Sequence, residues 1–298
     1  MERPGTYAAR TGLVLKLKEV AALFKLRLTS LVVVSAVLGY WMGIPKGAFV
    51  LADAALLALA GMLVTGASNA LNQLLEVEAD GRMQRTAQRP LVRGTLSITE
   101  VWIVSAVAGA LGTLVLWLVF GPLTGILGLL SLFMYVALYT PLKKFSAWAV
   151  FVGAFPGAFP PMLGFVAATG HFGLGPGLLF AMQFMWQFPH FWSIAWVLHD
   201  DYKLANYHLL PSSGGRDRYS AFLIVLYTLF MIPVGLLPGV FGLTGLWASG
   251  TALVLGLWML VQALRLMRTL DKRDAKRLMF ASFLYLPVVQ LAYVLDKA

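Results

Sequence analysis

Residues 145–199 read FSAWAVFVGAFPGAFPPMLGFVAATGHFGLGPGLLFAMQFMWQFPHFWSIAWVLH, a run of 55 residues without Asp, Glu, Lys or Arg. One membrane-spanning helix needs about 20 such residues, so this run is long enough for two. The chain of 298 residues shares this character, since 59% of its residues are hydrophobic, 12% are charged and the mean hydropathy is +0.79. Soluble domains carry about 25% charged residues. The composition therefore indicates an all-α, polytopic membrane protein.

Five further stretches lack charged residues, and together with the first they predict nine spans. Gly121-Pro122, Pro238-Gly239 and the glycine-rich segment 170–177 divide the three longest stretches into two spans each. The predicted spans are residues 28–44, 53–75, 101–120, 123–141, 148–169, 178–198, 220–237, 244–264 and 278–295. The chain has no cysteine, which excludes disulfides and thiolate metal sites.

Lysine and arginine gather on alternate connections between the predicted spans. Of the 23 Lys and Arg residues, 21 lie in the N-terminal arm and in the second, fourth, sixth and eighth connections. Only Lys46 and Lys297 lie on the other side of the predicted membrane. By the positive-inside rule the N-terminus is cytoplasmic and the C-terminus is not, which requires an odd number of spans. We therefore assign the net charge of +10 to topology and expect no nucleic-acid partner.

The predicted organisation is a cytoplasmic, basic amphipathic arm at 1–27 followed by a single transmembrane domain at 28–298. The arm lacks the pattern of a cleavable signal or transit peptide, from which we expect a bacterial plasma (inner) membrane. Two acidic positions, Asp80 and Asp200, lie 120 residues and four predicted spans apart. This spacing predicts two four-helix units plus a ninth helix.

The second connection carries the first candidate site. Asn72, Glu76 and Asp80 are spaced four residues apart, so a helix places them on one face. Such oxygen ligands suit Mg²⁺, which bridges carboxylates to the phosphates of a substrate. Arg85 and Arg89 follow closely and could bind those phosphates directly. The alternative is a solvated helix end whose charges only fix the topology.

A second acidic pair, Asp200-Asp201, closes a later span on the same side of the membrane. Two facing carboxylate clusters would repel each other unless divalent cations lay between them. A diphosphate on a lipid tail fits this arrangement, since the apolar bundle would hold the tail. A transporter is the alternative from another class, although these carboxylates lie at one face and not at the midplane.

These residues also carry a resemblance to a known family. The pattern Asn72-x3-Glu76-x3-Asp80, continued by Arg85-Thr86 and Arg89-Pro90-Leu91, resembles the first aspartate-rich motif of the UbiA-type intramembrane prenyltransferases. With Glu in the middle it is most similar to the branch of protohaem IX farnesyltransferases (haem O synthases). Further matching segments are Tyr139-Thr140-Pro141-Leu142-Lys143, the Gly/Pro/Ala run 153–170, and Trp186-Gln187-Phe188-Pro189-His190-Phe191-Trp192 followed by Asp201-Tyr202.

The resemblance extends from about Lys25 into the last helices, with two departures. The family usually has Lys-Pro-Arg where this chain has Lys25-Leu26-Arg27. Many members have Lys where this chain has Asp200, which leaves open whether Asp200 or Asp201 would bind metal. The Gly/Pro/Ala run is expected to pack helices closely; the alternative is a broken helix that lines a cavity.

The resemblance implies nine helices around a central cavity, with the active site on the cytoplasmic side. The implied reaction transfers a farnesyl group from farnesyl diphosphate to a vinyl group of haem B, forming haem O for haem A biosynthesis. An aromatic or quinone-precursor acceptor is the nearest rival. The implied partners are haem B, farnesyl diphosphate and membrane lipid, and pathway logic adds a haem A synthase.

The resemblance also assigns roles to individual residues. The implied catalytic residues, which would also bind Mg²⁺, are Asn72, Glu76, Asp80, Asp200 and Asp201. The implied diphosphate contacts are Arg85, Arg89, Lys143 and Lys203. The implied contacts to haem or to the prenyl chain are Tyr139, His190, Phe191 and Trp192.

Overall fold

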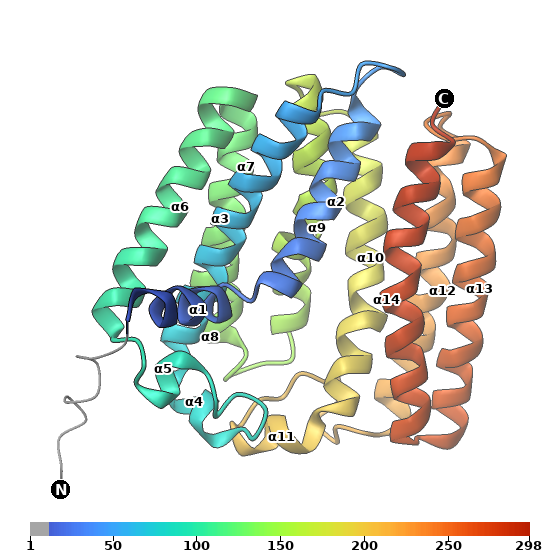
Figure 1. The fold of residues 1–298 in the computed structure, drawn as a ribbon. Helices are drawn as coiled ribbons and strands as arrows, with labels where there is room; N and C mark the ends of the chain where they lie inside the picture. Colours follow the sequence, from blue (N-terminus) through green and yellow to red (C-terminus); the bar gives the residue numbers. More distant parts are fainter. Residues whose placement is uncertain (1–11) are drawn as a thin grey trace, which may run out of the picture.

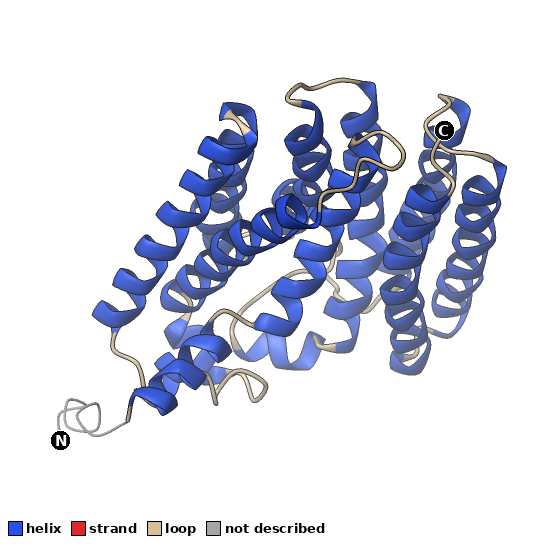
Figure 2. Cartoon of the chain, turned by 45° about the horizontal axis from the view of Figure 1, so that its top comes forward, coloured by secondary structure: helices blue, strands red, loops and turns tan. Residues whose placement is uncertain are grey.

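The computed structural model describes residues 12–298, apart from the side chains of Leu13 and Val14. Within this range nine long helical segments run side by side (Figure 1). They are α2 (Leu26–Gly43), α3 (Leu51–Leu75), α6 (Ile98–Phe120), α7 (Pro122–Phe133) continued by the π-helix η2 (Met134–Tyr139) and α8 (Thr140–Leu142), α9 (Ala149–Thr169), α10 (Leu174–Val197), α12 (Arg218–Val240), α13 (Leu246–Thr269) and α14 (Lys272–Leu295). The described residues form no strand, only an isolated β-bridge between Thr244 and Lys297 (Figure 2). The predicted all-α fold is confirmed.

Eight of these nine segments are long and apolar enough to cross a membrane. The segment that falls short is α10, which has no charged residue but carries Gln183, Gln187 and His190. The count of nine spans therefore stays a prediction, as does the side on which the N-terminus lies. The largest error in a predicted boundary is at α14, which begins at Lys272 and not at residue 278. A helix can continue beyond the membrane with charged residues, and the Asp271 side chain caps its start by accepting from the Arg273 N–H.

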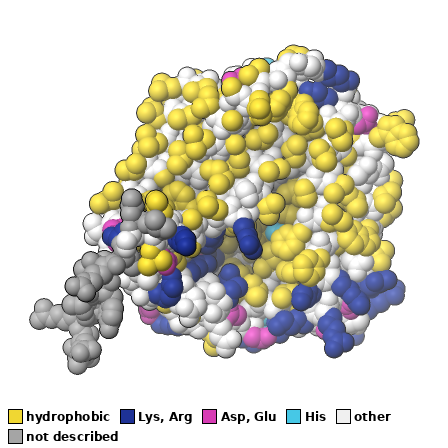
Figure 3. Space-filling model, viewed as in Figure 1, with side chains coloured by type: hydrophobic (Ala, Val, Ile, Leu, Met, Phe, Trp, Pro, Cys, Tyr) yellow, Lys and Arg dark blue, Asp and Glu magenta, His cyan; other side chains and the backbone are white. Residues whose placement is uncertain are grey.

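Short helices cover the lower end of the bundle in Figure 1. They are α1 (Leu13–Leu23), α4 (Val77–Arg82), α5 (Pro90–Arg93) and α11 (His199–Leu204). Most of the Lys and Arg side chains visible in Figure 3 gather toward this end, below a broad apolar band. The predicted amphipathic arm corresponds to α1, where Glu19 pairs with Arg93 at 2.6 Å and Leu17 stays 60% exposed. The predicted residues 1–11 of that arm lie outside the described range.

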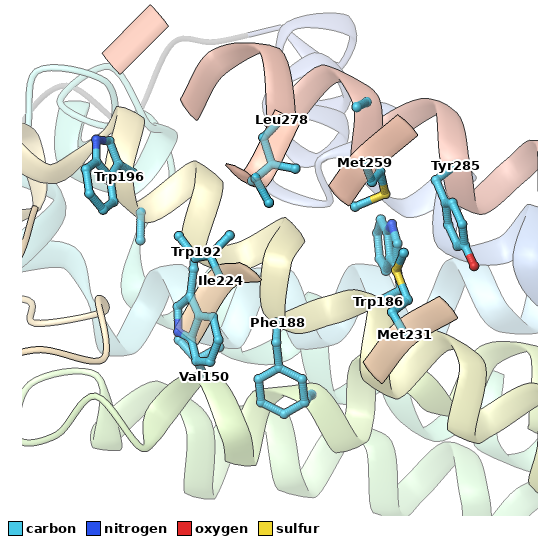
Figure 4. Packing of buried hydrophobic residues seen from close by; sticks show 14 of the residues in the cluster. Val150, Trp186, Phe188, Trp192, Trp196, Ile224, Met231, Met259, Leu278 and Tyr285 are labelled. Atoms are coloured by element: carbon cyan, nitrogen blue, oxygen red, sulfur yellow. The ribbon is translucent and has the colours of Figure 1, made fainter. Parts of the chain in front are cut away.

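The helices form two groups that contact each other through α2, α9, α10 and α14. On one side α3, α6 and α7 pack together with α2 and α9, and on the other α12 and α13 pack with α10 and α14. Contacts of α9 with α10 and of α14 with α2 join the groups. A cluster of aromatic side chains on α10, made by Trp186, Phe188, Trp192 and Trp196, packs against α12–α14 (Figure 4). This packing holds the lower end of α10, from which α11 and the second acidic pair follow.

The closest helix contact joins α2 and α9. A Cβ atom added at Gly39 would lie 2.1 Å from the carbonyl oxygen of Pro161, and one at Gly164 would lie 1.8 Å from that of Ala36. Only glycine permits this approach. The helix α9 is continuous over the Gly/Pro/Ala run, so the expectation of close packing is confirmed and the alternative of a broken helix is wrong.

Prolines inside α9 explain the polar residues on its neighbours. Pro161 has no N–H, so the carbonyl oxygen of Gly157 has no intrahelical partner. Gln183 Nε2 on α10 donates to this oxygen at 2.7 Å, and Gln183 Oε1 accepts from Ser35 Oγ at 2.8 Å and from Gln290 Nε2 at 2.7 Å. A buried carbonyl left without a donor costs about 1–3 kcal/mol. The network therefore ties α2, α9, α10 and α14 together, and it accounts for the lower hydropathy of α10.

Candidate active site

The first predicted site lies at the junction of α3 and α4. The helix is interrupted at Glu76 (φ −111°, ψ 10°), so the expected continuous helix is wrong in detail. The hydrogen-bond ladder still continues, because the Glu76 N–H donates to Asn72 O at 3.1 Å and the Asp80 N–H to Glu76 O at 2.7 Å. Asn72, Glu76 and Asp80 therefore line one cavity of about 120 Å³. Its other lining residues are Lys25, Met83, Arg85, Arg89, Tyr135, Tyr139, Lys143, Tyr202, Tyr207 and Leu209.

Three side chains hold the buried Glu76 carboxylate. Asn72 Nδ2 donates to Oε2 at 3.0 Å, Tyr207 Oη donates to Oε1 at 2.9 Å, and Lys143 Nζ lies 2.5 Å from Oε1. Asn72 Nδ2 also donates to Thr140 Oγ1 at 3.0 Å. Both of these bonds use the side-chain nitrogen Nδ2. The side-chain oxygen Oδ1 of Asn72 is therefore left for the cavity.

Asp80 is the most buried carboxylate of the cavity, with 1% exposure. Its Oδ2 pairs with Arg89, whereas its Oδ1 is buried and has no hydrogen-bond partner among residues 12–298. Burial raises the pKa of Asp80, and the charge of Arg89 opposes that rise. Thr86 Oγ1 donates to the Asp80 carbonyl oxygen at 2.8 Å and holds the turn that brings Arg89 back to the cavity.

Positive charge exceeds negative charge in this cavity. Among residues 12–298, the basic side chains of Lys25, Arg85, Arg89 and Lys143 line it together with two carboxylates. Lys25 enters from the junction of α1 and α2 in the left-handed conformation (φ 50°, ψ 54°), which costs a non-glycine residue about 1–2 kcal/mol. Burial and the nearby charges of Arg89 and Lys143 lower the pKa of Lys25 to about 7. A cavity with this excess favours an anionic ligand.

The two residues of the second acidic pair point to different places. Asp201 Oδ1 accepts from the Gln84 N–H at 2.9 Å, and its buried Oδ2 lies 4.0 Å from Arg85 Nε. The Asp200 side chain is 68% exposed and pairs with Arg216 at 3.0 Å. Neither residue of the pair belongs to the lining of the cavity, nor does the exposed Lys203, but Asp201 adjoins the cavity through Arg85.

Of the four residues expected to contact haem or the prenyl chain, only Tyr139 lines the cavity. The π-helix η2 directs Tyr135 and Tyr139 toward it with ring centroids 5.2 Å apart. Gly153 makes room for Tyr139, since a Cβ atom there would lie 2.6 Å from the ring. His190, Phe191 and Trp192 lie on α10 and do not line the cavity. Trp192 belongs to the aromatic core of Figure 4.

Sequence reasoning missed Lys25, Tyr135 and Tyr207. For Lys25 the sequence carries a signal, because Lys25-Leu26-Arg27 stands where the family usually has Lys-Pro-Arg at the start of the first span. Tyr135 and Tyr207 lie outside the quoted motifs, and tertiary packing alone brings them to the cavity.

The unpartnered oxygen atoms are the donors available to a cation. They are Asp80 Oδ1 and Asp201 Oδ2, both buried without a hydrogen-bond partner in the described part of the chain, and the side-chain oxygen Oδ1 of Asn72. Within residues 12–298 no three His, Asp or Glu side chains form a metal-binding cluster by themselves. A cation here would therefore need ligands from the substrate as well.

The fold and the cavity define an integral membrane protein with a mixed acidic and basic site at one end of an apolar bundle. Comparisons with known proteins make the class specific. The model of the UbiA prenyltransferase family matches residues 32–286. The chain therefore belongs to the UbiA prenyltransferase family and is a prenyltransferase.

Curated relatives and solved structures agree with this assignment. The chain is 46% identical over 276 residues to the protoheme IX farnesyltransferase of Cytophaga hutchinsonii, covering 92% of this chain and 96% of that one. It is 48% identical over 278 residues to the protoheme IX farnesyltransferase of Christiangramia forsetii, covering 92% and 91%.

Two solved structures share the fold. The UbiA homolog from Aeropyrum pernix K1 has a TM-score of 0.70 at 20% identity, covering 90% of this chain and 97% of that one. The UbiA homolog from Archaeoglobus fulgidus bound to GPP and Mg²⁺ has a TM-score of 0.69 at 14% identity, covering 93% and 99%.

Proposed function

We propose that the chain transfers the farnesyl group of farnesyl diphosphate to a vinyl group of haem B and so forms haem O. The observation that carries this proposal is the cavity at the lower end of the bundle, where four basic side chains and two carboxylates meet at the foot of apolar helices. The names of relatives up to 48% identical over most of the chain support haem as the acceptor.

The cations of the cavity would bind the diphosphate and stabilise it as a leaving group. Arg85, Arg89 and Lys143 come from two segments, the two arginines from the loop after α4 and the lysine from the end of α8. Because they surround one small volume, they can contact several phosphate oxygens at once. They stabilise the negative charge that develops when the bond between C1 of the farnesyl chain and the diphosphate oxygen breaks.

Mg²⁺ fits the donor set, since it prefers oxygen ligands and is usually held by one or two carboxylates plus substrate phosphates. Asn72, Glu76, Asp80 and Asp201 are the residues that would hold it, with Asp201 favoured over the exposed Asp200. When bound, it would supply further positive charge to the leaving diphosphate. The structure of the Archaeoglobus fulgidus homolog is bound to GPP and Mg²⁺, which supports a divalent cation in this fold.

The aromatic rings of the cavity would stabilise the other product of bond breaking, the allylic cation. The rings of Tyr135, Tyr139 and Tyr207 line the same cavity as the cations, and the faces of aromatic rings attract positive charge. The terminal carbon of the vinyl group then forms a carbon–carbon bond with C1. Water adds to the new cation beside the porphyrin as a hydroxyl group and releases a proton.

We place this cavity on the cytoplasmic side, because the basic connections of the sequence lie at the same end of the bundle. The tail of the farnesyl chain would extend upward among the apolar helices. A haem A synthase that takes up the product stays a prediction.

The proposal is tested by measuring diphosphate release from membranes that contain the chain, supplied with farnesyl diphosphate and Mg²⁺. We expect release that depends on haem B and stops with EDTA. Release that depends on an aromatic acid or quinone precursor, and not on haem B, would keep the prenyltransferase and reject the acceptor. Full haem-dependent release from the Glu76→Gln and Asp80→Asn variants would reject the site.

A further inference from the structure

A buried threonine lies behind the first candidate site. Thr140 is the first residue of α8 and follows the π-helix η2 directly, and both elements pack against α3 (Figure 1). It is 2% exposed and does not belong to the lining of the cavity. Its hydroxyl group contacts the side chain of Asn72 on α3 and the backbone of η2. The proposed reaction gives this hydroxyl group no contact with a substrate.

The hydrogen bonds of Thr140 have a fixed direction. Thr140 Oγ1 lies 2.8 Å from the carbonyl oxygen of Tyr135, which can only accept. A hydroxyl group has one hydrogen, so Thr140 donates it to Tyr135 O and must accept from Asn72 at 3.0 Å. The Asn72 atom that faces Thr140 is therefore the side-chain nitrogen Nδ2.

The π-helix brings the acceptor of this hydroxyl group into reach. In a regular α-helix a threonine hydroxyl bonds the carbonyl oxygen three or four residues before it. Thr140 Oγ1 instead bonds Tyr135 O, five residues before it, and the Thr140 N–H donates to the same oxygen. The wide turn that directs Tyr135 and Tyr139 toward the cavity thus also sets the direction in which the Thr140 hydroxyl group can accept.

Both hydrogens of the Asn72 amide are used. One is donated to Thr140 Oγ1 and the other to Glu76 Oε2, each at 3.0 Å. The amide plane is held at two points, and its oxygen Oδ1 points away from both acceptors. Without the Thr140 hydroxyl group, one buried hydrogen of Nδ2 would lose its acceptor and Glu76 alone would hold the amide.

We propose that Thr140 is a positioning residue, whose hydroxyl group holds the Asn72 amide so that Oδ1 faces the divalent cation. This inference rests on the proposed function, in which Asn72 is one of the residues that would hold Mg²⁺. Mg²⁺ demands near-ideal octahedral geometry, so an amide that is free to turn would bind it less well. Removing a partner that orients a metal ligand typically costs about 10–100-fold in metal affinity or activity.

The test measures the binding of Mn²⁺, a substitute for Mg²⁺ that EPR detects, as well as turnover. The full chain in lipid nanodiscs is titrated with Mn²⁺ in the presence of a farnesyl diphosphate analogue that cannot be cleaved, because a CH₂ group replaces the oxygen between C1 and the diphosphate. Thr140→Val lacks the hydroxyl group and Thr140→Ser keeps it. Thr140→Val is also combined with Asn72→Ala.

Thr228→Val is the matched control. Thr228 is fully buried, and its hydroxyl group donates to Ile224 O at 2.7 Å within α12, away from the lining of the cavity. The substitution therefore makes the same chemical change in the interior of the bundle without touching Asn72.

Thr140→Val should weaken Mn²⁺ binding about tenfold or more and raise the Mg²⁺ concentration for half-maximal turnover by the same factor. Thr140→Ser should restore both toward the wild-type values, and Thr228→Val should match wild type. With Asn72→Ala already present, Thr140→Val should weaken Mn²⁺ binding no further, because its hydroxyl group acts through Asn72. Thr140→Ala carries the same comparison if Thr140→Val does not fold.

Two kinds of result would contradict the reasoning at different levels. Wild-type Mn²⁺ affinity in Thr140→Val, an equal loss in Thr140→Ser, or an equal loss with and without the Asn72 side chain would overturn the positioning role and leave the proposed function standing. A wild-type chain that binds neither Mn²⁺ nor the analogue would instead overturn the proposed function.

Discussion

Removing one hydroxyl group tests how the cavity holds Glu76. Tyr207 Oη donates to Glu76 Oε1 at 2.9 Å, and the residue is 2% exposed. Burial and the neighbouring Glu76 raise the pKa of Tyr207, so the hydroxyl stays protonated and donates. Tyr207→Phe removes this bond and retains the volume of the ring.

The structure sets the expected magnitude. A hydrogen bond to a charged group contributes about 1.5–3 kcal/mol. Glu76 keeps its contacts with Asn72 and Lys143, so we expect a loss near the lower limit. A loss of about 1.4 kcal/mol in the transition state corresponds to about a tenfold decrease in kcat/KM. The assay measures kcat/KM for farnesyl diphosphate in proteoliposomes at saturating haem B.

Tyr285→Phe provides the matched control. The Tyr285 hydroxyl is buried and has no hydrogen-bond partner in the described range, so its removal should leave kcat/KM unchanged and stabilise the fold by up to about 1 kcal/mol. Equal kcat/KM values for Tyr207→Phe and wild type, or an equal loss in both variants, would refute the reasoning about Glu76.

Four further substitutions test the site and the fold. Asp201→Asn should lower kcat about 100-fold. Asp200→Asn should change kcat by no more than about twofold, because the Asp200 side chain is exposed. The same steady-state assay measures both, and a larger loss in Asp200→Asn would contradict the choice of Asp201 as the metal-binding residue. Gln183→Leu leaves the Gly157 carbonyl oxygen without its donor and should destabilise the bundle by about 1–2 kcal/mol in reversible detergent unfolding, and unchanged stability would argue against the network. Gly164→Ala places a Cβ atom 1.8 Å from Ala36 O, so we expect about 1–3 kcal/mol of destabilisation in the same experiment, and a wild-type midpoint would mean that α2 and α9 are not packed this closely.

The sequence predicted the helices well because a bilayer restricts what can cross it. Charge-free stretches have few alternatives to helices in lipid, and each predicted span corresponds to a long helical segment. The same reasoning misplaced the start of α14, since a helix that leaves the membrane can continue through charged residues such as Lys272 and Arg273. It also gave no sign of the π-helix η2, because wide turns depend on tertiary contacts.

The site was predictable where its residues are neighbours on one helical face. The spacing of Asn72, Glu76 and Asp80 indicated a shared surface, and it survived the interruption of the helix at Glu76. Tyr207 could not be found in this way, because it reaches Glu76 across 131 residues of sequence. The difference between Asp200 and Asp201 was equally hidden, since it depends on which of two adjacent side chains faces Arg85 and which faces Arg216.

The most direct test of the account is the mass of the haem product. Membranes containing the chain are incubated with haem B, farnesyl diphosphate and Mg²⁺, and the extracted haem is analysed by mass spectrometry. The account predicts a gain of one farnesyl and one hydroxyl group, absent with EDTA and absent in the Asp80→Asn variant at equal protein level. Haem of unchanged mass from folded wild-type protein would contradict it.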